Sequence, residues 1–178
     1  MYRYFLAFLF LIFSFSVNNL NAQGFPEAWA GIWKGEMTNH NVKGKQSQFP
    51  MELHILPTDS AHVWTWRLVY HPNDRPKDAR NYQLVLKDKA AGHYVIDEKN
   101  GILLDAYYID ERLISNFSIG NNEIMSVQYL KKKKLITEMV ATTVNPLNIT
   151  GGTSEEVPDV SSYLIDGFFR GELKKSKK

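Results

Sequence analysis

The middle of the chain alternates between apolar and polar residues, and this pattern constrains the fold more than any other feature. Residues 51–56 place Met51, Leu53 and Ile55 on one side of an extended segment. Residues 62–70 alternate more strongly, and one face of that segment consists of His62, Trp64, Trp66, Leu68 and Tyr70. Period-two patterning with aromatic and β-branched residues is typical of half-buried β-strands. Similar segments follow as far as residue 143, so the sequence predicts strand after strand.

Short turns separate these segments. Asn100-Gly101 is the strongest hairpin signal, because both central residues of such a turn need positive φ. We expect further turns at residues 88–92, 110–111, 120–122 and 131–134. Hairpins make neighbouring strands antiparallel, so six strands from about Asn81 to Thr143 should form a meander. With strands near residues 30–38, 48–56, 62–71 and 161–173, the total is about ten, and only a short turn is expected around Pro26 to Ala30.

Ten strands without covering helices leave two exposed sheet edges unless the sheet closes on itself. We therefore predict an all-β fold: a single antiparallel up-and-down β-barrel of about ten strands. A two-sheet sandwich is the alternative, but sandwiches usually need Greek-key crossings, which a meander lacks. Two long loops, residues 72–80 and 145–160, interrupt the pattern and are expected at the rim of the barrel.

The N-terminus resembles a secretory signal peptide. Arg3 precedes an apolar run from Phe5 to Val17, and a small residue, Ala22, follows at the expected cleavage point. We expect residues 1–22 to be removed and the protein to be exported to the periplasm or the outside of the cell. The alternative is an uncleaved N-terminal anchor. No second apolar run is long enough to span a membrane, so no transmembrane segment is expected after cleavage.

The remainder is the size of one domain, with the barrel over residues 23–173 and a disordered basic tail over 174–178. The chain has no cysteine, so disulfides are excluded. The formal net charge is +2. Much of the positive charge lies in Arg3 and in the four lysines of the tail, and the body without them is near −3. Nucleic-acid binders carry positive charge on a folded face, so the sequence predicts no nucleic-acid partner.

The first strand opens with Gly31-Ile32-Trp33-Lys34-Gly35. This stretch resembles the Gly-x-Trp signature at the start of the first strand in lipocalins and other calycins. The resemblance implies that Trp33 closes one end of the barrel and that an arginine near the end of the last strand packs across its indole. Arg170 is the only arginine of the last strand here, so Gly31, Trp33 and Arg170 are the predicted closure residues. Glycine would permit the bend and the close approach of the opposite backbone.

Nitrobindin-like barrels, which are ten-stranded calycins, open with a similar Gly-x-Trp-x-Gly pattern. The haem-binding members take their iron ligand from a histidine in the final strand, and this sequence has none there. Its histidines are His40, His54, His62, His71 and His93. The sequence therefore predicts no haem and no other cofactor.

The aromatic face of residues 62–70 is the best candidate for a ligand site. Ligand cavities are lined mainly by apolar and aromatic side chains with a few polar groups. The alternative is an interior filled by side chains, as in barrels of about eight strands. We predict that the ligand-binding residues are His62, Trp64, Trp66, Leu68 and Tyr70.

Catalytic and metal sites are not predicted. Asp59, Ser60 and His62 are the residue types of a hydrolase triad, but neighbours in one turn cannot converge. Carboxylates at Asp97, Glu98 and Asp105 flank a hairpin, where such groups usually face solvent. His54 and His62 lie on successive strands but lack a third metal ligand, and His54 is expected on the face opposite Met51, Leu53 and Ile55.

The sequence thus favours an exported, lipocalin-like protein that binds a small apolar or amphipathic molecule in the barrel. One alternative is a non-enzymatic envelope interaction protein with a filled core and partner-binding rim loops. An enzyme of unknown type is the third possibility.

Overall fold

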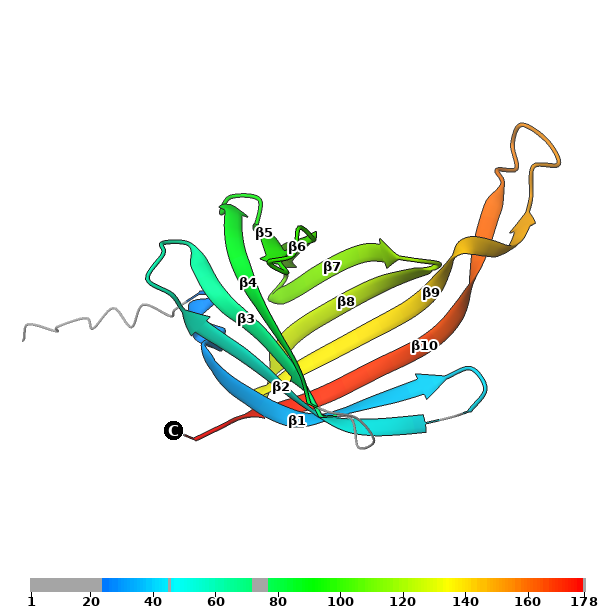
Figure 1. The fold of residues 1–178 in the computed structure, drawn as a ribbon. Helices are drawn as coiled ribbons and strands as arrows, with labels where there is room; N and C mark the ends of the chain where they lie inside the picture. The colour runs from blue at the N-terminus through cyan, green and yellow to red at the C-terminus, as the bar shows by residue number, and fades with distance from the viewer. Residues whose placement is uncertain (1–23, 45, 72–76, 178) are drawn as a thin grey trace, which may run out of the picture.

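The computed structural model describes residues 24–44, 46–71 and 77–177, so the predicted leader lies outside the described residues. These residues form ten antiparallel strands that close into one barrel in the order β1-β10-β9-β8-β7-β6-β5-β4-β3-β2 (Figure 1). The strands are β1 (Gly31–Asn41), β2 (Gln46–Pro57), β3 (Val63–Tyr70), β4 (Asp78–Asp88), β5 (His93–Asp97), β6 (Leu103–Ile109), β7 (Arg112–Ile119), β8 (Asn122–Lys131), β9 (Lys134–Thr150) and β10 (Val160–Lys175). The predicted all-β barrel is confirmed, and the two-sheet sandwich is excluded.

The hairpin turns lie where the sequence placed them, but the turn at Asn100-Gly101 differs from the expected two-residue type. β5 ends at Asp97 and β6 begins at Leu103, and Asn100 does not have positive φ. Lys99 and Gly101 have φ of 62° and 97°, and Asp110 and Glu111 have φ of 47° and 59°. The left-handed conformation tightens these turns enough for each strand to pair with the next. The six strands predicted between residues 81 and 143 are confirmed as β4 to β9.

The barrel closes where the first strand meets the last. β1 pairs with β10 from Trp33↔Lys175 to Asn41↔Gly167. A Cβ atom at Gly35 would lie 2.5 Å from the backbone oxygen of Glu172. Glycine at this position therefore lets the two backbones approach. β10 continues to Lys175, because its last two residues, Lys174 and Lys175, pair with Lys34 and Trp33 of β1. Both residues belong to the segment predicted to be a disordered tail.

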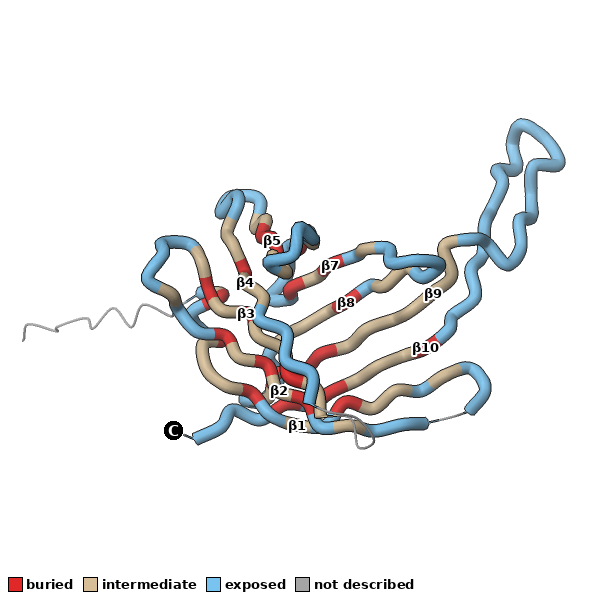
Figure 2. The backbone as a smooth tube through the Cα atoms, in the orientation of Figure 1, coloured by how far each residue is buried: buried red, intermediate tan, exposed pale blue. Residues whose placement is uncertain are grey.

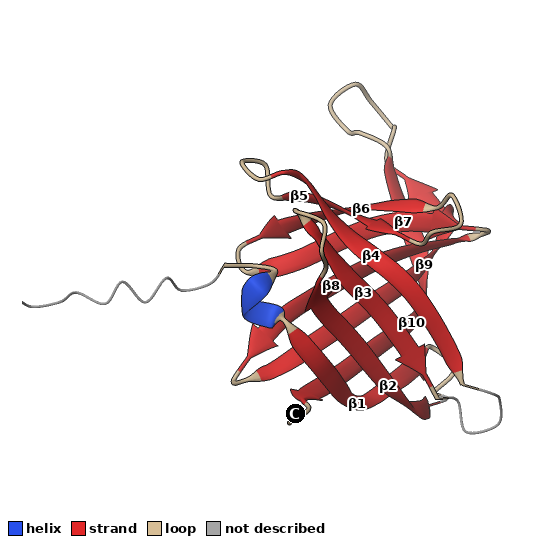
Figure 3. Ribbon diagram, turned by 60° about the vertical axis from the view of Figure 1, so that its left-hand side comes forward, coloured by secondary structure: helices blue, strands red, loops and turns tan. Residues whose placement is uncertain are grey.

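An aromatic cluster closes the end of the barrel at which β1 begins. The short helix η1 (Glu27–Trp29) lies beside this end (Figure 3). Phe25 stacks on Tyr108 of β6 with ring centroids 4.4 Å apart, and its ring is also 5.0 Å from that of Tyr94 of β5. β5 and β6 are far from β1 around the ring of strands. The segment before β1 therefore crosses this end of the barrel and covers it.

The predicted partner of Trp33 is wrong. Trp33 is buried, and its indole Nε1 donates a hydrogen bond to the backbone oxygen of Trp29 at 2.8 Å. The cation over its ring is Lys175, whose Nζ lies 5.5 Å from the ring centroid. Arg170 instead faces outward, where it pairs with Glu138 at 2.6 Å and with Glu172 at 3.2 Å. The reason is strand parity: Gly171 and Leu173 are the buried neighbours on β10, so Arg170 must point to the opposite face.

The last two strands extend beyond the barrel as a two-stranded arm (Figure 1). The loop predicted for residues 145–160 is wrong in extent, because β9 runs to Thr150 and pairs with β10 from Val160 onward. Pro146 is tolerated because β8 pairs with β9 only as far as Thr143, so this edge needs no N–H donor. The arm is exposed to its tip, whereas the buried residues lie in the body of the barrel (Figure 2).

Candidate ligand-binding cavity

A cavity of about 690 Å³ occupies the barrel and reaches the rim opposite the aromatic cluster. Most of its wall is apolar or aromatic. The apolar wall is formed by Phe49, Met51, Leu53, Trp66, Leu68, Ile96, Leu104, Phe117, Ile119, Ile124, Met139 and Phe169. These residues come from β2, β3 and all strands from β5 to β10. The interior is therefore open above the closed end, unlike the filled interior that the sequence left as an alternative.

Three of the five predicted ligand-binding residues line the cavity, and the other two do not. Trp66, Leu68 and Tyr70 line the cavity. Trp64 is buried below it, with its ring 6.5 Å from that of Tyr94 in the closed end. His62 lies in the turn before β3, where it is exposed. Alternate residues of one strand share a face but differ in depth, so Trp64, at the closed end of β3, does not line the cavity.

Charged and phenolic groups form the rim of the cavity. Arg80 Nε donates to Asp78 Oδ2 at 3.0 Å, and its guanidinium lies 5.2 Å from the Tyr70 ring centroid. Burial raises the pKa of Tyr70, with the nearby Arg80 opposing the shift, and burial and Glu98 together raise the pKa of Tyr82. These phenols therefore stay protonated at neutral pH.

Sequence reasoning found Tyr70 but missed Asp78 and Arg80, because it treats residues 72–80, with two prolines, as a loop. Strand β4 in fact begins at Asp78. Asp78, Arg80 and Tyr82 alternate in phase with the buried Leu84. Extending the period-two pattern of Tyr82 and Leu84 backward would have found them.

Four neutral polar side chains project into the deeper part of the cavity, namely Ser115, Ser126, Gln128 and Thr137. We call them the polar strip. Ser115 is the cross-strand partner of Ser126, and Gln128 is the partner of Thr137. The signal in the sequence is a hydroxyl or amide at a position where alternation demands an apolar residue, as in Leu113, Ser115 and Phe117.

The other candidate groups do not converge. Asp97 faces away from the cavity and pairs with Lys99 at 3.6 Å, and Asp105 pairs with His93 at 2.6 Å on the outer surface. Glu98 alone of the three carboxylates lines the cavity. Asp59 and Ser60 lie exposed in the turn between β2 and β3. The described residues contain no group of three His, Cys, Asp or Glu side chains placed to hold a metal ion.

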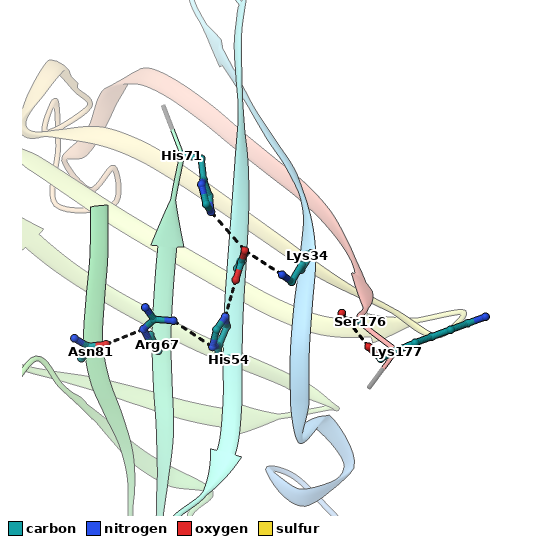
Figure 4. Close-up of polar contacts among 8 residues, drawn as sticks. Lys34, His54, Arg67, His71, Asn81, Ser176 and Lys177 are labelled. Carbon is teal, nitrogen blue, oxygen red and sulfur yellow. Dashed lines mark hydrogen bonds and ion pairs between the residues drawn. The ribbon is translucent and has the colours of Figure 1, made fainter. Parts of the chain in front are cut away.

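His54 belongs to a polar network on the outside of the barrel (Figure 4). Glu52 accepts from His54 Nε2 at 2.8 Å, and Lys34 Nζ lies 3.2 Å from it. Arg67 Nη1 lies 3.4 Å from His54 Nδ1, and Arg67 Nε donates to Asn81 at 2.8 Å. The chain of donors assigns the imidazole hydrogen to Nε2. The network ties β1, β2, β3 and β4 together.

Glu52 should make the unfolding of the protein pH-dependent. Burial alone would raise the pKa of Glu52, but hydrogen bonds from His54 and Lys34 and their charges outweigh it and lower the pKa from 4.5 to about 2. A lowered pKa stabilises the fold above the unfolded-state pKa, and this contribution is lost as the pH falls from 4.5 through about 2. Relative to Glu52→Gln, we expect the wild type to lose about 1–2 kcal/mol over that window, less than the full shift implies because solvent screens the group.

Urea unfolding of both proteins between pH 7 and pH 2 measures this difference. Glu36→Gln, which removes an exposed carboxylate from β1, is the control. Parallel pH profiles for the wild type and Glu52→Gln would show that the outer network does not stabilise the fold.

A shallow outer groove of about 470 Å³ runs over β1 and β10 and is lined by charged side chains such as Lys34, Glu36 and Arg170. Within residues 24–44, 46–71 and 77–177, no helix has the length and apolar character needed to cross a membrane.

Comparison with known proteins identifies the fold. The barrel is similar to the S-type phycobiliprotein lyase CPES from Guillardia theta, with a TM-score of 0.55 and 9% sequence identity over 85% of this chain and 91% of that chain. No protein-family model matches the sequence, and no curated protein matches it significantly. The chain therefore shares the closed β-barrel fold of this structure, and at this identity the likeness shows the fold alone.

Proposed function

We propose that the protein binds a small apolar or amphipathic molecule inside the barrel. The observation that carries this proposal is the cavity of about 690 Å³, which is within the usual range of about 300–1,000 Å³ for small-molecule sites. It is closed at one end by packed aromatic rings and lined by apolar side chains. A few polar groups also line it, namely the charged groups at the rim and the polar strip deeper inside. Sites that orient a ligand have such placed polar groups.

The sequence supports a finer version of this proposal. The Gly-x-Trp start and the ten-strand closure support a lipocalin-like or nitrobindin-like protein that carries its ligand without haem. The basic and apolar N-terminal segment supports export to the periplasm or beyond. The structural neighbour with a similar barrel is named as a phycobiliprotein lyase.

The cavity can be tested with N-phenyl-1-naphthylamine, a neutral dye that becomes fluorescent in apolar surroundings. We expect saturable binding to the wild type and at least a tenfold loss in Leu68→Trp, because the added ring would occupy the cavity. Thr65→Trp is the matched control, since it adds the same ring to the outer face of β3 and should leave binding within about twofold.

Equal dye binding by Leu68→Trp and the wild type would place the dye outside the barrel. A wild type that gives no saturable enhancement would mean that the interior takes no apolar ligand. Circular dichroism on each variant shows that the barrel has folded.

A further inference from the structure

The polar strip lies just above an apolar floor. Along β7 and β9, the next inward residues toward the closed end are Leu113 and Leu135, and both are 0% exposed. Toward the rim, the next inward residues are Phe117 and Met139, which line the cavity. A ligand that enters from the rim therefore passes an apolar wall before it reaches Ser115 and Thr137.

The hydrogen bonds within the strip leave capacity for a ligand. Gln128 Nε2 donates to Ser126 Oγ at 2.6 Å and lies 3.5 Å from Thr137 Oγ1. A hydroxyl that accepts one hydrogen bond still has its own hydrogen to donate. The hydroxyl hydrogens of Ser126 and Thr137, the hydroxyl of Ser115 and the carbonyl oxygen of Gln128 thus offer both donors and an acceptor. Buried polar groups are normally satisfied, because leaving one unpaired costs about 1–3 kcal/mol.

The strip contains no charge. The ionic groups that line the cavity, Asp78, Arg80 and Glu98, lie on β4 and beside the end of β5 at the rim. A carboxylate or an ammonium group held at the strip would be buried without a counter-ion, which is strongly unfavourable. A neutral group that both donates and accepts hydrogen bonds would match the strip without this cost.

We propose that the ligand is an amphipathic molecule whose neutral hydrogen-bonding end, an amide or a hydroxyl group, enters first and binds to the polar strip. Its apolar body then fills the space between Trp66, Leu68 and Phe117 up to the rim. This inference rests on the proposed function, since it names the ligand class of the same cavity.

The test compares three ten-carbon competitors for the bound N-phenyl-1-naphthylamine, namely decanamide, decan-1-ol and decanoate. Undecane, which has as many heavy atoms as decan-1-ol, is the purely apolar member. A triple variant replaces three of the four polar side chains of the strip with little change of volume and keeps Ser115: Ser126→Ala, Gln128→Met and Thr137→Val. We expect the affinity for decanamide to fall at least tenfold in this variant and that for decan-1-ol by about threefold to tenfold. Undecane should bind as well as it does to the wild type, or more tightly, because only the polar contacts are lost.

The control carries the same kinds of substitution on outward-facing positions of the barrel: Thr65→Val, Gln83→Met and Ser118→Ala. It should bind all four competitors as the wild type does, within about twofold. If the triple variant fails to fold, Thr137→Val alone replaces a hydroxyl by a methyl group of similar size. We expect that variant to lose about threefold in decanamide affinity and nothing for undecane.

The outcomes separate this inference from the proposed function. No dye binding to the wild type would overturn both. Dye binding with unchanged decanamide affinity in the triple variant would overturn the inference alone. Decanoate that binds as tightly as decanamide and loses affinity equally in the triple variant would show that the strip takes an anion, which also contradicts the inference.

Discussion

Replacing Trp33 by alanine is expected to lower the free energy of unfolding by about 3–5 kcal/mol. The indole is 3% exposed, and its N–H bonds to the backbone oxygen of Trp29 at 2.8 Å. Truncation leaves a cavity in the closed end and leaves that buried oxygen without its donor. It also removes the ring that holds η1, and with it Phe25, over the barrel end. Guanidinium unfolding followed by far-ultraviolet circular dichroism measures the loss.

Two matched variants separate this packing from the cation contacts. Lys175→Ala should cost about 0.5–1 kcal/mol, the usual value of an exposed cation over an aromatic ring. Arg170→Ala removes outer ion pairs with Glu138 and Glu172 and should cost no more than about 1 kcal/mol. Coupling in a double-mutant cycle should appear between Trp33 and Lys175, not between Trp33 and Arg170. A Trp33→Ala variant as stable as the wild type would show that the aromatic cluster does not close the barrel.

Replacing Gly35 by valine is expected to cost about 3 kcal/mol or more, at the upper end of the overpacking range. A Cβ atom there would lie 2.5 Å from the Glu172 oxygen and 2.9 Å from Leu173 Cδ2. The first contact is with backbone, which cannot move aside as a flexible side chain can. The pairing of β1 with β10 must therefore open locally, and amide hydrogen exchange should rise in both strands together with the loss of stability.

Gly24→Ala is the control for this substitution, because a Cβ at Gly24 would have no atom within 4 Å. It should change stability by less than about 0.5 kcal/mol. Equal stability of Gly35→Val and the wild type, with unchanged exchange in β1 and β10, would contradict the close approach on which barrel closure depends.

The sequence predicted the faces of the strands better than the depth of their residues. Period-two alternation placed Trp64, Trp66 and Tyr70 together on the inner face of β3, as the structure has them. It could not show that Trp64 lies below the cavity, because that depth is set by Phe25 and by strands distant in sequence. Depth depends on tertiary packing, whereas facing depends on the local geometry of one strand.

Two features that the sequence analysis missed, the outward position of Arg170 and the polar strip, could have been predicted from the alternation of residues. Arg170 follows Phe169 and precedes Gly171, so the alternation of β10 already assigned it to the outer face. The polar strip was equally visible as hydroxyl and amide residues at inward positions of three consecutive strands. The arm is different, since the pairing of β9 with β10 beyond the barrel overrides turn-forming residues such as Asn145 and Pro146.

The most direct test of ligand binding inside the barrel is a crystal structure with 10-bromodecan-1-ol bound. Anomalous scattering locates the bromine independently of any assumption about the site. We predict a bromine peak inside the barrel, on the rim side of Leu68 and Phe117, with the hydroxyl at Ser126 or Thr137. A peak confined to the outer groove over β1 and β10, or no ordered bromine with side chains filling the interior, would contradict the account.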